Sequence, residues 1–241
     1  MTAIQTTDLC KRFGKVQAVS YLNLTVNEGE IFSLLGVNGA GKTTTVRMLC
    51  GILKPDSGDA LLCGKSIVRE RKAVKPLLNL SPQETAVARN LTVRENLRLM
   101  AGIYGIADAE KKIAQTMDAL EITEVADRRA GKLSGGYQRR LSIAMALLTA
   151  PKILFLDEPT LGLDVLARRA LWKNIEALRG KVTVILTTHY MEEAAALSDR
   201  IGIMAAGTLR ACDTPDALLR LSGTDNLEDA FIQLVGKEAA Q

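Results

Sequence analysis

One segment, Gly36 to Thr44 (GVNGAGKTT), constrains the fold of this chain more than any other part of it. It matches the phosphate-binding loop pattern G-x-x-x-x-G-K-[ST], whose fixed positions are Gly36, Gly41, Lys42 and Thr43. The apolar run 31–35 before it predicts a short buried strand, and residues 45–49 after it suit a helix. A strand, a glycine-rich loop and a helix in this order are typical of an α/β fold.

The chemistry of such a loop is the binding of a nucleoside triphosphate. Glycines let the chain bend until several backbone N–H groups point at one anion, and the N-terminus of the following helix adds partial positive charge. Lys42 can reach the β- and γ-phosphates, and the Thr43 hydroxyl can hold Mg²⁺. A glycine-rich turn that binds nothing is the alternative, and the flanking strand and helix argue against it.

Composition indicates a globular chain. Of the 241 residues 47% are hydrophobic and 24% are charged, which excludes a disordered protein. No apolar run approaches the ~18 residues of a membrane helix, and the N-terminus lacks the apolar core of a secretory signal, so we expect a cytoplasmic location. The net charge of +4 is too small to indicate nucleic acid as a partner. The basic run 65–72 is interpreted as a solvated helix face.

The four cysteines give no sign of a metal site or a disulfide framework. They stand at Cys10, Cys50, Cys63 and Cys212, without a C-x-x-C pair or a companion group of histidines. We therefore expect reduced thiols that are mostly buried.

Hydrophobic periodicity divides the chain into strands and helices. Strands are expected over 4–9, 18–26, 31–35, 59–62, 77–81, 153–156 and 182–188, with a closing hairpin of 200–204 and 207–210. Helices are expected over 46–53, from 91 with Thr92 and Glu95 as a capping box, around 113–120, and over 141–150, 166–178, 191–197 and 215–236. Residues of about 84–130 therefore form a helical insert in an otherwise α/β chain.

Polar residues follow two of the expected strands. Asp157 and Glu158 come directly after 153–156, either as a Mg²⁺ site beside a triphosphate or as solvated caps, and the phosphate-binding loop upstream favours the metal. His189, the only histidine, follows 182–188 and either has a structural role or faces the same ligand.

Phe13, between the first strands, either stacks on a purine or packs in the core.

A second anion site is indicated where the helix over 141–150 is preceded by Leu133-Ser134-Gly135-Gly136-Tyr137-Gln138. This segment resembles the signature sequence of the ABC transporter family, and the chain resembles the family's nucleotide-binding subunit from Thr7 to about Leu234. The family's other motifs occur in its order, at Phe13, Gly36–Thr44, Gln83, Ile153–Glu158, Leu163-Asp164 and His189. The segments TTHYMEEA and LEDAFIQLVG are similar to ATPases that power exporters with a separate membrane subunit.

The resemblance implies one ABC ATPase domain over 1–241 with an α/β P-loop NTPase core, in which helices flank a mixed sheet. The core with an antiparallel β-subdomain would comprise 1–83 and 151–241, and a helical subdomain with the signature would comprise 84–150.

The resemblance also implies ATP and Mg²⁺ as cofactors and a role for each motif. Glu158 would act as general base, with His189 and Lys42 at the γ-phosphate. Mg²⁺ would be held by Thr43, Gln83 and Asp157. Nucleotide contacts would come from Phe13, Gly36, Asn38, Gly39, Ala40, Gly41, Lys42, Thr43, Thr44 and Gln83. A second copy would supply Ser134, Gly135 and Gly136 to the same ATP, with Asp164 crossing the interface.

The expected partners are a second motor copy, identical or paralogous, and a transmembrane permease that holds the protein on the inner face of the membrane. The permease would dock between residues 85–105 and the core, where Ile103 and Tyr104 are either groove residues or buried. Three positions depart from common family residues: Phe13 for Tyr, Tyr137 for Gln and Val165 for Pro. A soluble ABC ATPase of DNA repair or translation is an alternative, as is a noncatalytic nucleotide sensor, which Glu158 and His189 disfavour.

Overall fold

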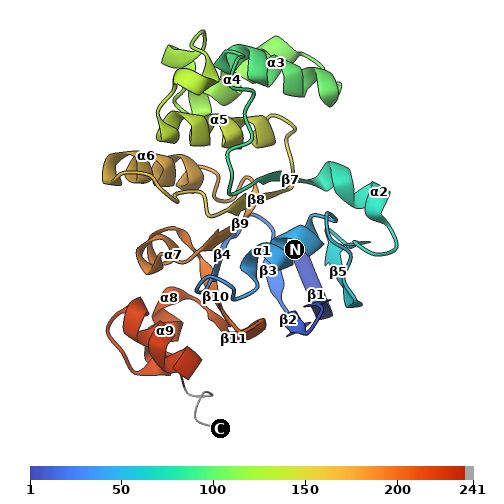
Figure 1. The fold of residues 1–241 in the computed structure, drawn as a ribbon, viewed down its shortest axis with the longest axis vertical. Helices are drawn as coiled ribbons and strands as arrows, with labels where there is room; N and C mark the ends of the chain where they lie inside the picture. The colour runs from blue at the N-terminus through green and yellow to red at the C-terminus, as the bar shows by residue number, and fades with distance from the viewer. Residues whose placement is uncertain (237–241) are drawn as a thin grey trace.

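The computed structural model describes residues 1–236, and its centre is a six-stranded mixed sheet (Figure 1). Its strands run in the order β11-β10-β4-β9-β8-β7. Their bounds are Thr208–Asp213 (β11), Arg200–Ala205 (β10), Ile31–Leu35 (β4), Thr183–Thr188 (β9), Ile153–Asp157 (β8) and Leu78–Ser81 (β7). All neighbours pair in parallel except β10 and β11, which form the expected antiparallel hairpin. The predicted α/β fold with a mixed sheet is confirmed.

The three middle strands are buried on both faces. Every residue of β4, β8 and β9 is buried, as the continuous apolar runs predicted. Alternate side chains enter different cores: Leu154 and Leu156 face the core that includes the helical insert, whereas Ile153 and Phe155 face the core under the antiparallel sheet. Parallel strands between two cores end at a common edge, and the loops that follow them meet there.

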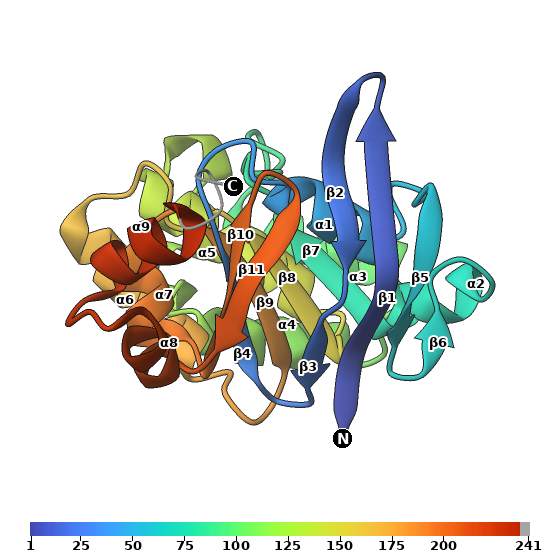
Figure 2. The same ribbon diagram turned by 90° about the horizontal axis from the view of Figure 1, so that it is seen from below.

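An antiparallel sheet is found near the N-terminus as expected, but the single strand expected over 18–26 is wrong, because residues 23–24 divide this part of the chain into two strands. The sheet contains β1 (Thr2–Phe13), β2 (Val16–Leu22), β3 (Thr25–Asn27), β5 (Ser57–Leu62) and β6 (Lys65–Ser66). In Figure 2 the β1–β2 hairpin projects beyond the rest of the sheet. Its turn, which follows Phe13 directly, therefore lies at the tip of that projection.

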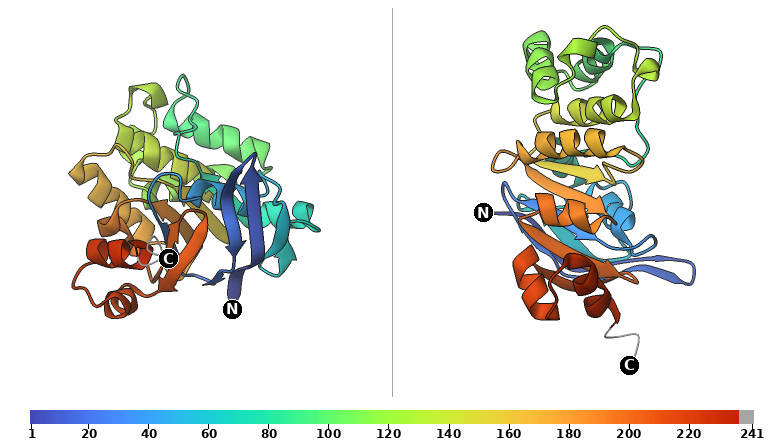
Figure 3. Two further views of the ribbon diagram at one scale, coloured as in Figure 1. Left: turned by 60° about the horizontal axis from the view of Figure 1, so that its bottom comes forward. Right: turned by 90° about the vertical axis from the view of Figure 1, so that its left-hand side faces the viewer.

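Helices cover one end of the central sheet (Figures 1 and 3). They are α3 (Val93–Ile103), α4 (Ala109–Ala119) and α5 (Gly135–Leu147), with short 3₁₀ turns at Thr123–Val125 and Ala130–Lys132. The predicted capping box starts α3: the Thr92 hydroxyl accepts from the Glu95 N–H, and the Glu95 carboxylate accepts from the Thr92 N–H. Apolar residues of these helices share one core with α6 (Val165–Glu176) and the sheet.

The C-terminal helices lie at the other end of the molecule. They are α7 (Met191–Leu197), α8 (Pro215–Ser222) and α9 (Leu227–Gly236), packed over β10 through a small apolar core. The single helix expected over 215–236 is wrong. Gly223, with φ +72°, ends α8 in the left-handed conformation that suits glycine, and the chain restarts at α9.

Three helix predictions need correction. The helix after the phosphate-binding loop is α1 (Lys42–Leu49), which starts earlier and stops before the predicted residue 53. The helix expected over 141–150 begins instead at Gly135, so α5 includes the two signature glycines. The basic run 65–72 is not a helix face, because β6 and a turn occupy most of it and α2 (Arg71–Val74) begins only near its end.

All four cysteines are free: Cys10 and Cys50 are buried, and Cys63 and Cys212 are partly exposed. Within residues 1–236, no helix combines the length and the apolar character that a bilayer span requires.

Candidate functional site

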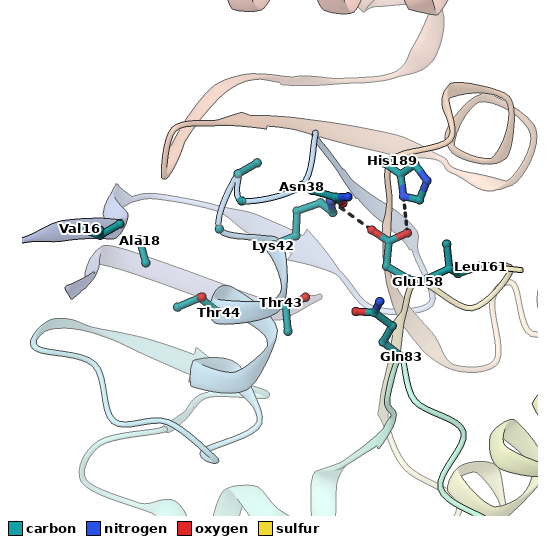
Figure 4. Close-up of a pocket in the computed structure, with 13 residues that line it drawn as sticks. Val16, Ala18, Asn38, Lys42, Thr43, Thr44, Gln83, Glu158, Leu161 and His189 are labelled. Atoms are coloured by element: carbon teal, nitrogen blue, oxygen red, sulfur yellow. Dashed lines mark hydrogen bonds and ion pairs between the residues drawn. The ribbon is translucent and has the colours of Figure 1, made fainter. Parts of the chain in front are cut away.

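The loops after β4, β7, β8 and β9 enclose a pocket of about 460 Å³ (Figure 4). Its lining residues are Val16, Ala18, Asn38, Gly39, Ala40, Gly41, Lys42, Thr43, Thr44, Gln83, Glu158, Leu161 and His189. The structure therefore brings together most of the residues that the sequence assigned to nucleotide and chemistry, although they are separated by up to about 150 positions.

The phosphate-binding loop wraps the N-terminus of α1. Gly41 precedes that helix with φ +103°, and a Cβ at this position would overlap the carbonyl oxygen of Ala18. A Cβ at Gly36 would likewise overlap the carbonyl oxygen of Met204. The loop thus needs glycine at both positions for close backbone packing. The Lys42 ammonium folds back over the loop and donates to the carbonyl oxygens of Gly36 at 2.7 Å and Val37 at 3.2 Å.

Three functional side chains form one connected chain across the pocket. Lys42 Nζ lies 3.2 Å from Glu158 Oε1, and His189 Nδ1 lies 2.8 Å from Glu158 Oε2 (Figure 4). Lys42 and Glu158 are each about 5% exposed, so the ion pair is shielded from water. A cation, a carboxylate and an imidazole in hydrogen-bonding contact can neutralise phosphate charge and hold a polarised water molecule.

The Glu158 backbone is held in an unusual conformation. Its φ is +48°, which is unfavourable for a residue with a side chain, and such conformations persist where neighbours fix them. The Glu158 N–H donates to the Thr187 carbonyl at 3.1 Å and approaches the Thr187 hydroxyl at 3.0 Å. Its carbonyl accepts from Arg139 Nη2 at 2.7 Å and from the Leu161 N–H at 3.2 Å. These contacts aim the carboxylate into the pocket.

Arg139 is a site-supporting residue that sequence reasoning did not single out. It comes from α5, is 3% exposed, and also donates to the carbonyls of Pro82 at 2.5 Å and Gln83 at 3.0 Å. Burial lowers its pKa, and the nearby carboxylates of Asp157, Glu193 and Glu158 oppose that shift. The available signal was a charged residue at the start of a mostly apolar helix.

The residues at the first turn of α1 and the end of β8 fit a magnesium ion. Thr43 Oγ1 lies 3.1 Å from Asp157 Oδ1, and the Thr187 hydroxyl donates to the same oxygen at 2.5 Å. Gln83 directs its side chain toward the same space (Figure 4). Hydroxyl, carboxylate and amide oxygens are the donors that Mg²⁺ prefers. No cluster of three His, Cys, Asp or Glu residues suited to a metal occurs in the described part of the chain.

Gly36 and Asp157 lie just behind the pocket wall, but five other predicted residues lie elsewhere. Phe13 is half-exposed and pairs with Val16, which lines the pocket, and the Lys11 ammonium lies 5.6 Å from its ring centre. Ser134 and Gly135 are exposed at the start of α5, and Gly136 is buried there. The fifth is Asp164, whose side chain caps α6 by accepting from the Ala167 N–H at 2.9 Å.

The signature segment and the start of α6 form one surface of the chain. A Cβ at Gly136 would stand 3.0 Å from the Ala167 side chain, and one at Gly135 would stand 3.7 Å from Leu163. The Ser134 side chain makes no cap hydrogen bond to α5. The N-terminus of α5 therefore presents polar groups outward from a surface that lies outside the pocket of its own chain.

Comparison with known proteins gives consistent matches. A family model described as "ABC transporter" matches residues 19–161, more than half of the chain. A probable multidrug ABC transporter ATP-binding protein, YbhF of Escherichia coli (strain K12), is 41% identical over 97% of this chain. The chain spans only 42% of that relative. The daunorubicin resistance ATP-binding protein DrrA2 of Streptomyces coeruleorubidus is 39% identical over 94% of this chain and 71% of its own length.

Solved structures agree with the sequence matches. A structure of an ATP binding subunit of an ABC transporter superposes with a TM-score of 0.85 at 26% identity, covering 97% of this chain and 99% of that one.

Proposed function

This chain belongs to the ABC transporter family, and on that premise we propose that it binds and hydrolyses ATP as the motor subunit of an exporter. The observation that carries the proposal is the contact of the buried Lys42 and the partly exposed His189 with the two oxygens of Glu158. The exporter class is supported by the relatives, whose names concern multidrug transport and daunorubicin resistance.

The residues divide the reaction between two sides of the pocket. On one side, Lys42 and the N–H groups of the phosphate-binding loop hold the β- and γ-phosphates. When the phosphates are bound, Lys42 contacts them in place of Glu158. On the other side, Glu158 accepts a proton from the attacking water, and His189 keeps the Glu158 carboxylate and the water in line with the γ-phosphate. Thr43, Asp157 and Gln83 would hold Mg²⁺, which neutralises charge on the phosphates when bound.

We further propose that each ATP is covered by a second copy. Phe13 stacks on the adenine at one end, and Ser134, Gly135 and Gly136 of the other copy donate to the γ-phosphate. The exposed position of Ser134 outside its own pocket supports this arrangement, because these donors then serve a neighbour. Asp164, at the edge of the same surface, crosses the interface. The partner copy is the same chain or a paralogue.

The proposed membrane contact lies on the helical subdomain, residues 84–150. Ile103 and Tyr104 at the end of α3 are 67% and 54% exposed, so the alternative that they are buried is wrong. We propose that they contact a coupling helix of a separate permease and hold the protein at the inner face of the membrane. Charge substitutions across 85–105 that leave permease binding and transport intact would refute this contact.

Phosphate release tests the hydrolytic proposal. The wild-type chain is expected to release phosphate from ATP with Mg²⁺, and Glu158→Gln is expected to bind ATP with similar affinity while releasing phosphate at least ~100-fold more slowly, because the general base is lost. Equal slow rates in the two proteins would instead support a noncatalytic nucleotide sensor.

A pull-down tests the transport proposal. Tagged Glu158→Gln with ATP is expected to capture a polytopic membrane protein from detergent-solubilised membranes, because the ATP-bound state persists. Recovery of ribosomes or DNA-bound proteins alone would favour the soluble ABC ATPase.

A further inference from the structure

Glu193 is a fully buried carboxyl group for which the mechanism above has no use. It lies in α7, four residues after His189, and its exposure is 0%. The indole N–H of Trp172, from α6, donates to Glu193 Oε1 at 3.1 Å. Carboxyl groups are rarely buried without a specific role for their oxygens. The side chain is therefore a candidate for a function beyond core packing.

The Glu193 carboxyl also interacts with the two segments that carry the chemistry. Hydroxyls of Thr188 and Thr160 approach the carboxyl closely enough to lower its pKa in part, although burial is the larger influence and raises it. Glu193 Oε2 and Thr160 Oγ1 are both buried, and neither completes a hydrogen bond of normal geometry in this structure. The Glu193 carboxyl and the Thr160 hydroxyl thus each keep a buried polar atom available for a further hydrogen bond.

Both loops lead directly to the reacting groups. Thr160 is two residues after Glu158, and the turn between them is closed by the bond from the Leu161 N–H to the Glu158 carbonyl at 3.2 Å. Thr188 directly precedes His189, and its hydroxyl accepts from the Tyr190 N–H at 2.9 Å. The Tyr190 ring stands 4.1 Å from the His189 ring, centre to centre. A displacement of Glu193 therefore reaches both partners of the contact between His189 and Glu158.

We propose that Glu193 is a positioning residue for ATP hydrolysis: it holds the Thr188–Tyr190 segment against the loop at Thr160 and so sets His189 relative to Glu158. The inference rests on the proposed function for its role in hydrolysis. The Trp172 indole holds Glu193 Oε1. Glu193 is therefore anchored to α6, the helix that Asp164 caps. A carboxyl that only filled space would affect stability and leave the His189 contact unchanged.

The single histidine allows a direct test without enzyme activity. The imidazole signals of His189 can be followed by NMR, because no other histidine occurs in the chain. Glu193→Ala is expected to shift them, whereas Glu193→Gln is expected to leave them near the wild-type position, since the amide keeps the shape and can both donate and accept. Glu176→Ala, which removes a carboxylate at an exposed position of α6, is the matched control and should cause no shift.

The same variants are then compared as ATPases. Glu193→Ala should lower kcat by about tenfold or more at nearly unchanged KM, because misplacement of a catalytic group affects the reaction and not the phosphate-binding loop. Glu193→Gln should recover most of kcat. An unchanged His189 signal in Glu193→Ala, or a Gln variant as impaired as the Ala variant, would overturn the proposal.

Two outcomes need a separate comparison: a Glu193→Ala variant that does not fold, and a wild type that hydrolyses no ATP. If Glu193→Ala does not fold, Trp172→Phe takes its place, because it removes the N–H donor and keeps an aromatic ring. A His189 shift in that variant supports the proposal, and its absence overturns it. If the wild type hydrolyses no ATP, the proposed function fails, while the NMR comparison still decides whether Glu193 positions His189.

Discussion

Gly41 stands where the structure has no room for a side chain. Its φ of +103° is unfavourable for other residues, and a Cβ would overlap the Ala18 carbonyl oxygen and approach the Met204 side chain at 2.7 Å. We expect Gly41→Ala to displace the loop from α1 and to weaken ATP binding by at least ~10-fold, with a loss of stability above the about 1–2 kcal/mol of the left-handed backbone alone.

Gly14 provides the matched control for this prediction. It also has a positive φ, +57°, but nothing lies within 4 Å of a Cβ built there. Gly14→Ala should therefore lose only the conformational part, about 1–2 kcal/mol, and keep ATP binding. Urea unfolding and nucleotide titration of both variants make the comparison, and similar losses in the two would contradict the steric argument.

The Glu193 carboxyl also gives stability a pH dependence of known sign. Burial raises its pKa above the ordinary value of 4.5, so the folded protein keeps a proton that the unfolded chain releases. The stability that this group contributes is present below the unfolded pKa and is lost as the pH rises toward the folded pKa. Glu193→Gln carries no such proton, so its free energy of unfolding should improve relative to wild type as the pH rises above about 5. Urea unfolding across this range checks the trend, which a constant difference would refute.

Among the secondary-structure elements, the start of α3 has the most complete local support. The capping box of Thr92 and Glu95 satisfies two otherwise free N–H groups, and the hydrogen bond from the Thr92 N–H is the main cause of a lowered Glu95 pKa. Thr92→Ala should lower the free energy of unfolding by about 1 kcal/mol.

Thr116→Ala is the control for the capping prediction. Its hydroxyl donates to the Lys112 carbonyl within α4, and alanine is the better helix former at an interior position, so stability should stay equal or increase slightly. The two variants are compared by urea unfolding under identical conditions. A loss for Thr116→Ala as large as that for Thr92→Ala would show that the cap is not the cause.

Local patterns explain why some elements were predictable. The buried parallel strands were visible as short apolar runs, and α3 was visible through its cap. The break between α8 and α9 was missed, although Gly223 was a usable local signal. The early start of α5 was missed because Gly135 and Gly136 have poor helix propensity and depend on packing against Leu163 and Ala167.

The functional site, like the fold, was predictable where the signal lies in adjacent residues, and not where it depends on contacts between distant segments. The phosphate-binding loop follows from a contiguous motif, and Asp157, Glu158 and His189 were singled out by their positions directly after expected strands. The resemblance added Gln83 and the contacts from a second copy. The charge of Arg139 in a mostly apolar helix was a local signal, but it did not identify the Glu158 carbonyl as the partner. No local signal indicated that Val16 and Ala18 would line the pocket, because these contacts depend on how distant segments pack. Motifs therefore identify the groups that react, whereas the groups that aim them follow only from the fold.

The chain as a whole carries two separate halves of a proposed ATP site. One half is the pocket with Lys42 and Glu158, and the other is the exposed surface around Ser134 and Asp164. In the proposed arrangement, two copies placed head to tail would complete both sites, and ATP would link them. We therefore propose that ATP binding and association of two copies are one event.

The most direct measurement is the mass of Glu158→Gln in solution with and without ATP, by light scattering. A monomer near 26.0 kDa is expected without nucleotide, and a species of twice that mass is expected with ATP. Adding Ser134→Glu, which places a negative charge where the γ-phosphate would be met, should abolish the dimer while ATP binding to the monomer persists. If Glu158→Gln binds ATP and remains a monomer at every concentration, or if Ser134→Glu leaves the dimer intact, ATP does not join two copies through the surface around Ser134.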